Sequence, residues 1–318
     1  MKKRLGLILV ILGLALGSAA CQLPALTTAS PPPTTAEGLA RLQPGDGSDL
    51  LDQLLASGTL RAGIHVWPTA EYAPPAFRDT AVGGALNGFE VETIRLVAAG
   101  LGLELELIEA DPQVLTQGTW GNQWDVGLGL LAPLDQPAPG AAPGLSYTIP
   151  YVYLPTGIAL AAADNRIEGL DQLVGQRLGV LEQSLYQRQL TASEPLTIQQ
   201  QQFSLAFPAG IRPVPLSSLQ RAIQSLSRAV PDERQFDALL GPTPIFEQAI
   251  GQGERIKLAP EAKFIGFHPA AIAVVPREGL AVERLISELN RVLVALQQQG
   301  ILAELHLKWY GQDYSRPR

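Results

Sequence analysis

The stretch EVETIRLVAAGLGLELELI, residues 90–108, contains a helix pattern followed directly by a strand pattern. In its first half Val91, Ile94 and Val97 recur at the spacing of one helix face, and Gly100 is expected to end that helix. In its second half apolar residues alternate with glutamates over 103–108, which is typical of a half-exposed strand. A helix joined to a strand by so short a turn indicates an α/β protein.

The same alternation continues along the rest of the chain. Short apolar runs predict strands at 60–66, 124–131, 156–163, 177–181, 236–240 and 269–275. Amphipathic spacing predicts helices at 217–229, 243–250, 282–296 and 301–309, and another helix that opens near Ser184. Such alternation indicates mostly parallel sheets covered by helices, with ligands at the carboxyl ends of the strands. Two sheets of this kind facing each other would leave a cleft between them.

Composition limits the classes of function. The chain has 318 residues, 46% of them hydrophobic, which is enough for two compact lobes. Its net charge is −7 and it has no long basic run, so nucleic acid is not expected as a partner, because phosphate binding needs clustered lysine and arginine. The single cysteine excludes an intrachain disulfide.

The first residues predict an export signal over 1–20. Lys2, Lys3 and Arg4 are followed by an apolar run over 5–16 that is too short to span a bilayer comfortably, and then by small residues. Cys21 comes directly after them, as in a bacterial lipobox, which predicts a lipoprotein anchored through this cysteine. The alternative is an ordinary secretory signal that leaves a free thiol.

Residues 21–47 are expected to form the lipid anchor and a flexible tether. This segment is rich in proline, threonine, alanine, serine and glycine, and a segment of that composition buries little apolar surface. Together, the export signal and the anchor predict an extracytoplasmic location, in the periplasm or on the outer face of the cell membrane.

A series of short motifs between residues 58 and 311 resembles the bacterial extracellular solute-binding proteins of family 3, which serve amino-acid ABC importers and include the glutamine-binding protein. The matching motifs are, in order, 58–64, 74–77 (PPAF), 88–92 (GFEVE), 124–125 with Gly129, 146–151, 170–180, 236–240 and 308–311.

The resemblance implies an α/β type II periplasmic-binding-protein fold, with mixed, mostly parallel sheets in two lobes. Lobe one would comprise 48–152 plus 268–318, and lobe two 153–267. The two chain crossings would lie near 151–155 and 264–269 and form a hinge that ligand closes.

The family's ligand clamp has no counterpart in this sequence. In the family an arginine holds the ligand carboxylate and an aspartate in the second lobe holds its ammonium group. The matching positions are Pro137 and Pro242, the family's neighbouring threonine is matched by Ala132, and one aromatic wall position is matched by Pro112. Because a buried ligand charge without a partner costs several kcal/mol, we expect other residues to supply the clamp or the ligand not to be an ordinary α-amino acid.

The candidate ligand-binding residues follow from their places at strand ends and loops. They are Trp67, Tyr72, Phe77, Gly129, Leu130, Ser184, Tyr186 and Thr243, with His65 as a further possibility. Each has a structural alternative: the three aromatic residues of 67–77 can simply cover lobe one, Ser184 can be only an N-cap, and His65 can be a core histidine. Tyr147 and Tyr151 are expected to pack at the hinge.

No sequence motif for catalysis, metal or cofactor binding is found. The glycines of 127–132 fit a dinucleotide fingerprint by letters, but Pro133 prevents the helix that must follow. His65, His268 and His306 lack metal-ligand spacing.

We therefore expect a monomeric protein that is not an enzyme and has no cofactor. It is expected to deliver a small polar ligand, an amino acid or a related molecule, to an ABC transporter permease. A sensory binding module and a dehydratase-type enzyme on the same scaffold remain as alternatives.

Overall fold

The computed structural model describes residues 42–192, 195–198, 200–203, 207–228, 230, 233–277 and 279–317. The predicted signal peptide (1–20), Cys21 and the tether as far as residue 41 lie outside the described residues. The described strands form two larger sheets and two hairpins, and we call each larger sheet with its helices a lobe.

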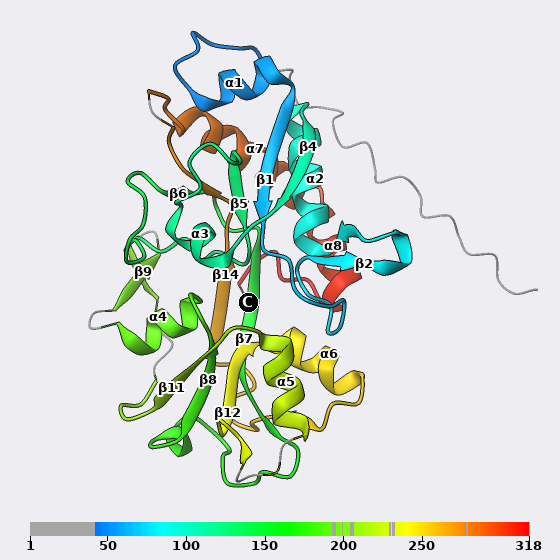
Figure 1. Ribbon diagram of the computed structural model, residues 1–318, viewed down its shortest axis with the longest axis vertical. Coiled ribbons are helices and arrows are strands. Elements are labelled where there is room, and N and C mark those ends of the chain that lie inside the picture. The colour runs from blue at the N-terminus through cyan, green and yellow to red at the C-terminus, as the bar shows by residue number, and fades with distance from the viewer. Residues whose placement is uncertain are drawn as a thin grey trace, which may run out of the picture. The chain divides into compact units, whose positions relative to one another are not determined.

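Lobe one is built on a five-stranded sheet in the order β4-β1-β5-β15-β6 (Figure 1). Its central strand β1 (Thr59–Ile64) runs parallel to β4 (Glu104–Glu109) on one side and to β5 (Val126–Leu128) on the other. The antiparallel strands β15 (Ala273–Val274) and β6 (Ser146–Tyr147) complete the sheet. The sheet is therefore mixed, with its parallel part next to the predicted cleft.

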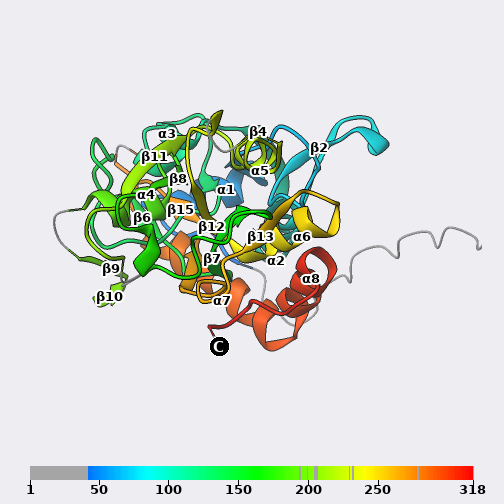
Figure 2. The same cartoon turned by 90° about the horizontal axis from the view of Figure 1, so that it is seen from below.

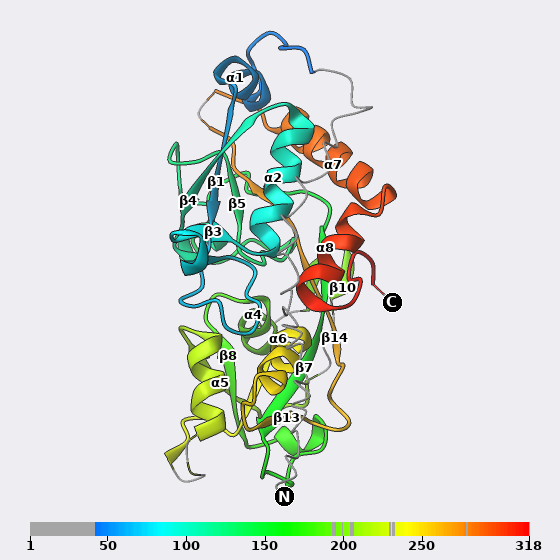
Figure 3. The same cartoon turned by 90° about the vertical axis from the view of Figure 1, so that its right-hand side faces the viewer.

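Helices from well-separated parts of the sequence cover this sheet. They are α1 (Leu50–Ser57), α2 (Phe89–Leu101), α3 (Pro112–Gln117), α7 (Glu283–Gln298) and α8 (Ile301–Tyr310). Figure 3 shows α2, α7 and α8 packed against one another on one side of the sheet. The buried faces of α1, α2 and α7 share one apolar core with β1 and β5. Each helix thus buries its apolar stripe against the sheet, as the helical spacing predicted.

Gly100 does not end its helix, contrary to the sequence prediction. Helix α2 continues through it to Leu101, and Gly102 in the left-handed conformation is the C-cap. A Cβ at Gly100 would lie 2.6 Å from the Cγ1 of Val292 on α7. The glycine therefore allows α2 and α7 to approach closely, a role that sequence alone does not distinguish from a helix stop.

Lobe two is built on a six-stranded sheet in the order β11-β8-β12-β7-β13, with β14 also paired to β7. Strand β8 (Arg177–Leu181) runs parallel to β11 (Arg212–Leu216) and β12 (Ala238–Pro242). The remaining strands are antiparallel to their neighbours; they are β7 (Val152–Ala161), β13 (Ile256–Leu258) and β14 (Gly266–Ala270). The helices of this lobe are α4 (Leu185–Thr191), α5 (Leu219–Arg228) and α6 (Thr243–Gly251).

Two hairpins and two single turns of 3-10 helix complete the described structure. They are β2 (Phe77–Asp79) with β3 (Ala85–Asn87), β9 (Leu196–Ile198) with β10 (Gln201–Phe203), η1 (Thr80–Val82) and η2 (Asp171–Leu173). The β2–β3 hairpin projects outward in two perpendicular views (Figures 1 and 2).

Strands β7 and β14 join the lobes as an antiparallel pair. The register runs from Val152 opposite Ala270 to Thr156 opposite Gly266. Val152 and Ala270 belong to the core of lobe one, whereas the far end of β7 lies in the cores of lobe two. Two paired crossings of this kind form a hinge.

The predicted strand over 269–275 is in fact two strands in two different sheets. Strand β14 ends at Ala270 on the hinge and β15 begins at Ala273 in lobe one. Between them the backbone amide of Ala271 donates to the carbonyl of Leu131, and that of Ile272 donates to the hydroxyl of Thr148. The apolar run over 269–275 indicates that this segment is buried on both faces. It does not reveal that the chain passes from one sheet to the other.

One arrangement of arginine and aspartate appears in both lobes. In lobe one the backbone amide and Nε of Arg61 donate to one oxygen of Asp125, and Nη2 donates to the other. In lobe two Arg177 makes the same contacts to Asp237. Each pair fixes the start of one strand against the start of its parallel neighbour with a bidentate, charge-assisted contact.

Candidate functional site

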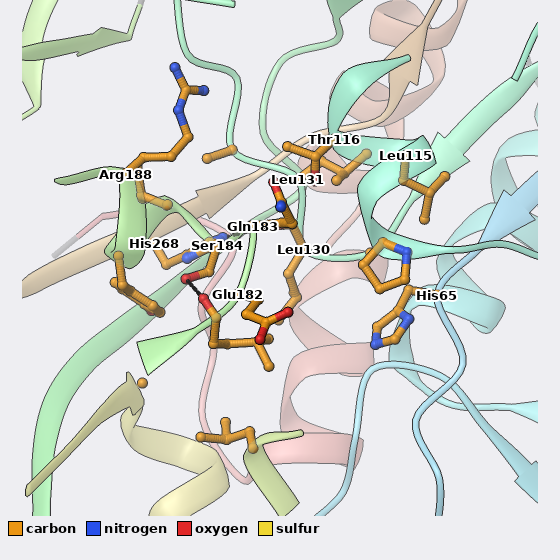
Figure 4. Close-up of a pocket in the computed structure, with 18 of the residues that line it drawn as sticks. His65, Leu115, Thr116, Leu130, Leu131, Glu182, Gln183, Ser184, Arg188 and His268 are labelled. Atoms are coloured by element: carbon orange, nitrogen blue, oxygen red, sulfur yellow. Dashed lines mark hydrogen bonds between the residues drawn. The ribbon is translucent and has the colours of Figure 1, made fainter. Parts of the chain in front are cut away.

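A cleft of about 360 Å³ lies between the two lobes and beside the hinge (Figure 4). Its lobe-one side is formed by residues 65, 67, 111–113, 115, 116, 129–132, 134 and 147, and its lobe-two side by 181–186, 188, 216, 217, 219 and 240–242. His268 of the hinge strand β14 completes the lining. Most of these residues are apolar, as is usual for a small-molecule site.

The cleft lies where the parallel strands of both lobes end. In lobe one, His65 follows β1, Asp111 follows β4 and Gly129 follows β5. In lobe two, Glu182 follows β8 and Ser217 follows β11. The predicted position of the site, at the carboxyl ends of parallel strands, agrees with this arrangement.

The peptide of Leu130 forms a fixed kink in the wall of the cleft. Leu130 has a φ of 53°, in the left-handed region that few non-glycine residues adopt, and Gly129 has a φ of 152°. The backbone amide of Leu130 donates to Glu90 Oε1 at 2.7 Å, and its carbonyl accepts from His268 Nε2 at 2.7 Å. The kink ends β5 at Leu128, so the strand predicted to reach residue 131 is shorter than expected.

Burial shifts the pKa values of the groups that hold this kink toward their uncharged forms. Glu90 is fully buried, and the loss of solvent raises the pKa of its carboxyl, which also accepts a hydrogen bond from the Tyr151 hydroxyl. Burial lowers the pKa of His268 to about 4. Because the Leu130 carbonyl can only accept, Nε2 of the neutral ring carries the proton, and Nδ1 is left as an acceptor without a partner among the described residues.

Five of the predicted ligand-binding residues line the cleft, namely Trp67, Gly129, Leu130, Ser184 and Tyr186. Several of their polar groups already have partners within the protein. The Ser184 hydroxyl donates to the Leu181 carbonyl at 2.6 Å and accepts from the Gln187 amide, as an N-cap does. The Tyr186 hydroxyl bonds the Thr156 hydroxyl at 2.9 Å.

The other three predicted residues do not line the cleft. The Tyr72 ring is buried against lobe two and its hydroxyl donates to Glu254 at 2.6 Å. Phe77 packs edge-on against Trp309 at 6.0 Å, and the Thr243 hydroxyl donates to the Lys263 carbonyl at 2.9 Å. For Phe77, the alternative of covering lobe one agrees with the structure.

Sequence reasoning missed several polar residues of the cleft. These include Asp111 after β4, Glu182 after β8, Arg188 in the last turn of α4 and His268 on the hinge strand β14. A charged residue directly after the predicted strand 177–181 was an available signal for Glu182, because strand ends were already expected to face the ligand.

The positions that were predicted from the sequence to match the family's clamp lie at or near the cleft. Ala132, Pro112 and Pro242 line it, and none of them carries a charge. Pro137 does not line it, but its carbonyl accepts a hydrogen bond from Arg188 of lobe two at 3.2 Å, and so does the carbonyl of Gln136 at 2.8 Å. Arg188 therefore contacts, from the opposite lobe, the loop that was predicted from the sequence to match the family's arginine.

Direct contacts between the lobes flank the cleft on two sides. On one side, Gln220 of α5 donates to the backbone carbonyls of Thr69 and Glu71, and Tyr72 bonds Glu254. We call this set the α5 contact. On the other side, Arg188 and the β9 hairpin hold the loop around residues 135–137, where Thr197 donates to Asp135 at 2.7 Å.

Replacing Gln220 with alanine is expected to increase the distance between the lobes. The change leaves two backbone carbonyls of the α5 contact without their donor, which weakens the closed arrangement by about 1–2 kcal/mol. Spin labels on cysteines introduced at exposed Thr119 and Arg221, with Cys21 replaced by serine, measure the change. The exposed Gln252→Ala is the matched control, and equal distance distributions for the two variants would rule out this role for Gln220.

Neither a metal cluster nor a membrane helix is found in the part of the chain that the structure describes. No group of three or more histidine, cysteine, aspartate or glutamate side chains is arranged to hold a metal ion there. None of the helices within these residues is long and apolar enough to cross a membrane.

The hinge, the two lobes and the cleft between them define a two-lobed α/β ligand-binding protein. The chain belongs to the bacterial extracellular solute-binding proteins, family 3, whose sequence profile matches residues 64–312. It is 26% identical over 268 residues to a probable amino-acid ABC transporter-binding protein of Haemophilus influenzae, an alignment that covers 84% of this chain and 91% of the relative.

Solved structures show the same fold. A mutant of ArgBP from T. maritima matches with a TM-score of 0.60 and 18% identity, covering 82% of this chain and 99% of that one. An amino acid ABC transporter substrate-binding protein from Streptococcus pneumoniae, bound to L-arginine, matches with a TM-score of 0.61 and 15% identity, covering 82% and 98%. The predicted type II periplasmic-binding-protein fold and the family resemblance are confirmed.

Proposed function

We propose that this protein binds a small polar ligand in the interlobe cleft outside the cytoplasm and presents it to the permease of an ABC importer. The observation that carries the proposal is the cleft itself, which residues of both lobes and of the hinge line together. Movement at β7 and β14 would expose the ligand, and closure would bury it. The family and the Haemophilus relative, a probable amino-acid ABC transporter-binding protein, support the transport role.

We propose the same lobe boundaries that were predicted from the sequence. Residues 48–152 and 268–318 would move as lobe one and residues 153–267 as lobe two. The division is supported by the register of β7 and β14, which begins at Val152 and ends at Ala270, next to both proposed boundaries.

A thermal-shift screen tests ligand binding. The purified protein is heated with amino acids, amines, polyamines, organic acids, sugars and short peptides at millimolar concentration. A ligand that binds only the folded state at 100 times its Kd stabilises it by about 2.7 kcal/mol, which raises the melting temperature by several degrees. If no compound of the screen shifts the melting temperature, the proposal fails and a sensory or structural role is favoured.

The protein is expected to have no dehydratase activity. Incubation with prephenate or arogenate, the substrates of dehydratases on this scaffold, is expected to leave both compounds unchanged by chromatography. Formation of an aromatic product would instead identify the chain as an enzyme.

We further propose that Cys21 anchors the mature protein, as a monomer, to the membrane through a lipid. The residue lies outside the described residues, and the proposal rests on the sequence around it. Cys21→Ser is expected to move the protein from the detergent fraction to the aqueous fraction in phase partitioning of the expressing cells. A wild-type protein already in the aqueous fraction would contradict lipid anchoring and favour simple secretion.

A further inference from the structure

Glu182 is exposed, and its carboxylate points into the cleft without a partner among the described residues. Its backbone is fixed where β8 ends, because its amide donates to the carbonyl of Leu216 at 2.8 Å. Figure 4 shows the side chain extending from lobe two toward His65 and Leu130 of lobe one. Among the described residues none forms a hydrogen bond or ion pair with this carboxylate.

The cleft offers few positively charged side chains that could pair with the carboxylate of Glu182. Arg188 is the only lysine or arginine among the described residues that line it, and Figure 4 shows its side chain directed away from Glu182. Its Nη2 donates to two carbonyls of the facing loop. Burial lowers the pKa of His65 and lowers that of His268 to about 4, so it disfavours a positive charge on either ring. The other acidic side chain, Asp111, accepts from the amides of Gln113 and Val114 as the cap of α3.

Two groups of the cleft that could donate to a ligand carboxylate are already used within the protein. The amide of Leu130 donates to the protein's own Glu90, and the Ser184 hydroxyl donates to Leu181. The donors that remain in the lining, such as the side chains of Gln183 and Ser217, are neutral. A ligand carboxylate there would lose hydration without gaining a positively charged partner other than Arg188. An ammonium or guanidinium group would instead meet the carboxylate of Glu182.

We propose that the ligand is a small cation without a carboxylate, such as a primary amine or a guanidinium compound, and that Glu182 binds its charged group. The inference rests on the proposed function, because it names the ligand class of the same cleft. The ligand's body would lie against the apolar lining and the ring of Trp67, which can also attract a cation.

Matched pairs of ligands test the ligand class by isothermal titration calorimetry. The pairs are arginine with agmatine, lysine with cadaverine, and phenylalanine with phenethylamine, so each pair differs by one carboxylate. We expect at least one amine to bind about tenfold or more tightly than its amino acid.

Glu182→Gln tests the residue. It keeps the shape of the side chain and removes its charge, and is expected to weaken amine binding about tenfold or more. Glu168→Gln, an exposed acid of lobe two outside the cleft lining, makes the same change of net charge and should bind within about twofold of the wild type. Circular dichroism melting confirms that both variants are folded.

The outcomes separate this inference from the proposed function. Amino acids that bind as tightly as their amines overturn the ligand class and leave the binding function intact. Undiminished amine binding by Glu182→Gln overturns the role of Glu182. A folded wild-type protein that binds no compound of any pair overturns the ligand class. The proposed function fails with it only if the thermal-shift screen also finds no ligand.

Discussion

Replacing Asp125 with alanine is expected to lower the free energy of unfolding by about 3–5 kcal/mol. The side chain of Asp125 is fully buried and contacts both Arg61 and Arg277. The side chain of Arg277 is only 14% exposed, and burial already lowers its pKa. Removal of the carboxylate leaves two neighbouring guanidinium groups facing each other with no negative charge between them.

Urea unfolding followed by tryptophan fluorescence measures this loss, because Trp124 precedes Asp125 directly. Asp237→Ala is the matched control in lobe two. Its partner Arg177 has a side chain 37% exposed to solvent, so the loss there should be clearly smaller. Equal losses for the two variants would show that burial does not decide the strength of this repeated contact.

A fall in pH from 6.5 to 4 is expected to destabilise the protein through its buried histidines. Burial lowers the pKa of His268 and of His306 to about 4 in the folded state, from 6.5. Between these values the unfolded chain binds more protons than the folded one, so the free energy of unfolding rises with pH through this window. Each histidine contributes up to about 3 kcal/mol, fully present above pH 6.5 and lost as the pH approaches 4.

His268→Gln isolates one of these contributions. Glutamine can still donate to the Leu130 carbonyl but does not titrate. Urea unfolding at each pH gives the free energy of unfolding as a function of pH. Between pH 4 and 6.5 the slope of this curve should be smaller for the variant, by an amount that corresponds to at most one proton. Glu90, whose raised pKa acts in the opposite direction, is present in both proteins and cancels in the comparison. Parallel curves for variant and wild type would show that His268 does not titrate in this window.

The sequence predicted those parts of the fold that depend on regular spacing. Strand β8 lies exactly at the predicted 177–181, and α7 lies close to the predicted 282–296, because each buries one regular set of apolar residues. Sequence could not show that Gly100 packs against Val292 or that the chain changes sheet after Ala270, since both depend on distant partners. The regular spacing of apolar residues indicates which side chains are buried, but not which residues they pack against.

The candidate site was predicted less completely than the fold. Ser184 and Tyr186 line the cleft as expected, but their hydroxyls are used within the protein. Tyr72 was predicted to face the ligand, whereas it joins the two lobes through Glu254, a residue far away in the sequence. Which polar groups stay free for a ligand depends on hydrogen bonds that only the folded chain defines.

A crystal structure grown with the compound that most raises the melting temperature tests the central claim most directly. We expect electron density for that compound between Glu182 of lobe two and the Leu130 kink of lobe one. Density elsewhere on the protein, with this space filled only by water, would contradict it.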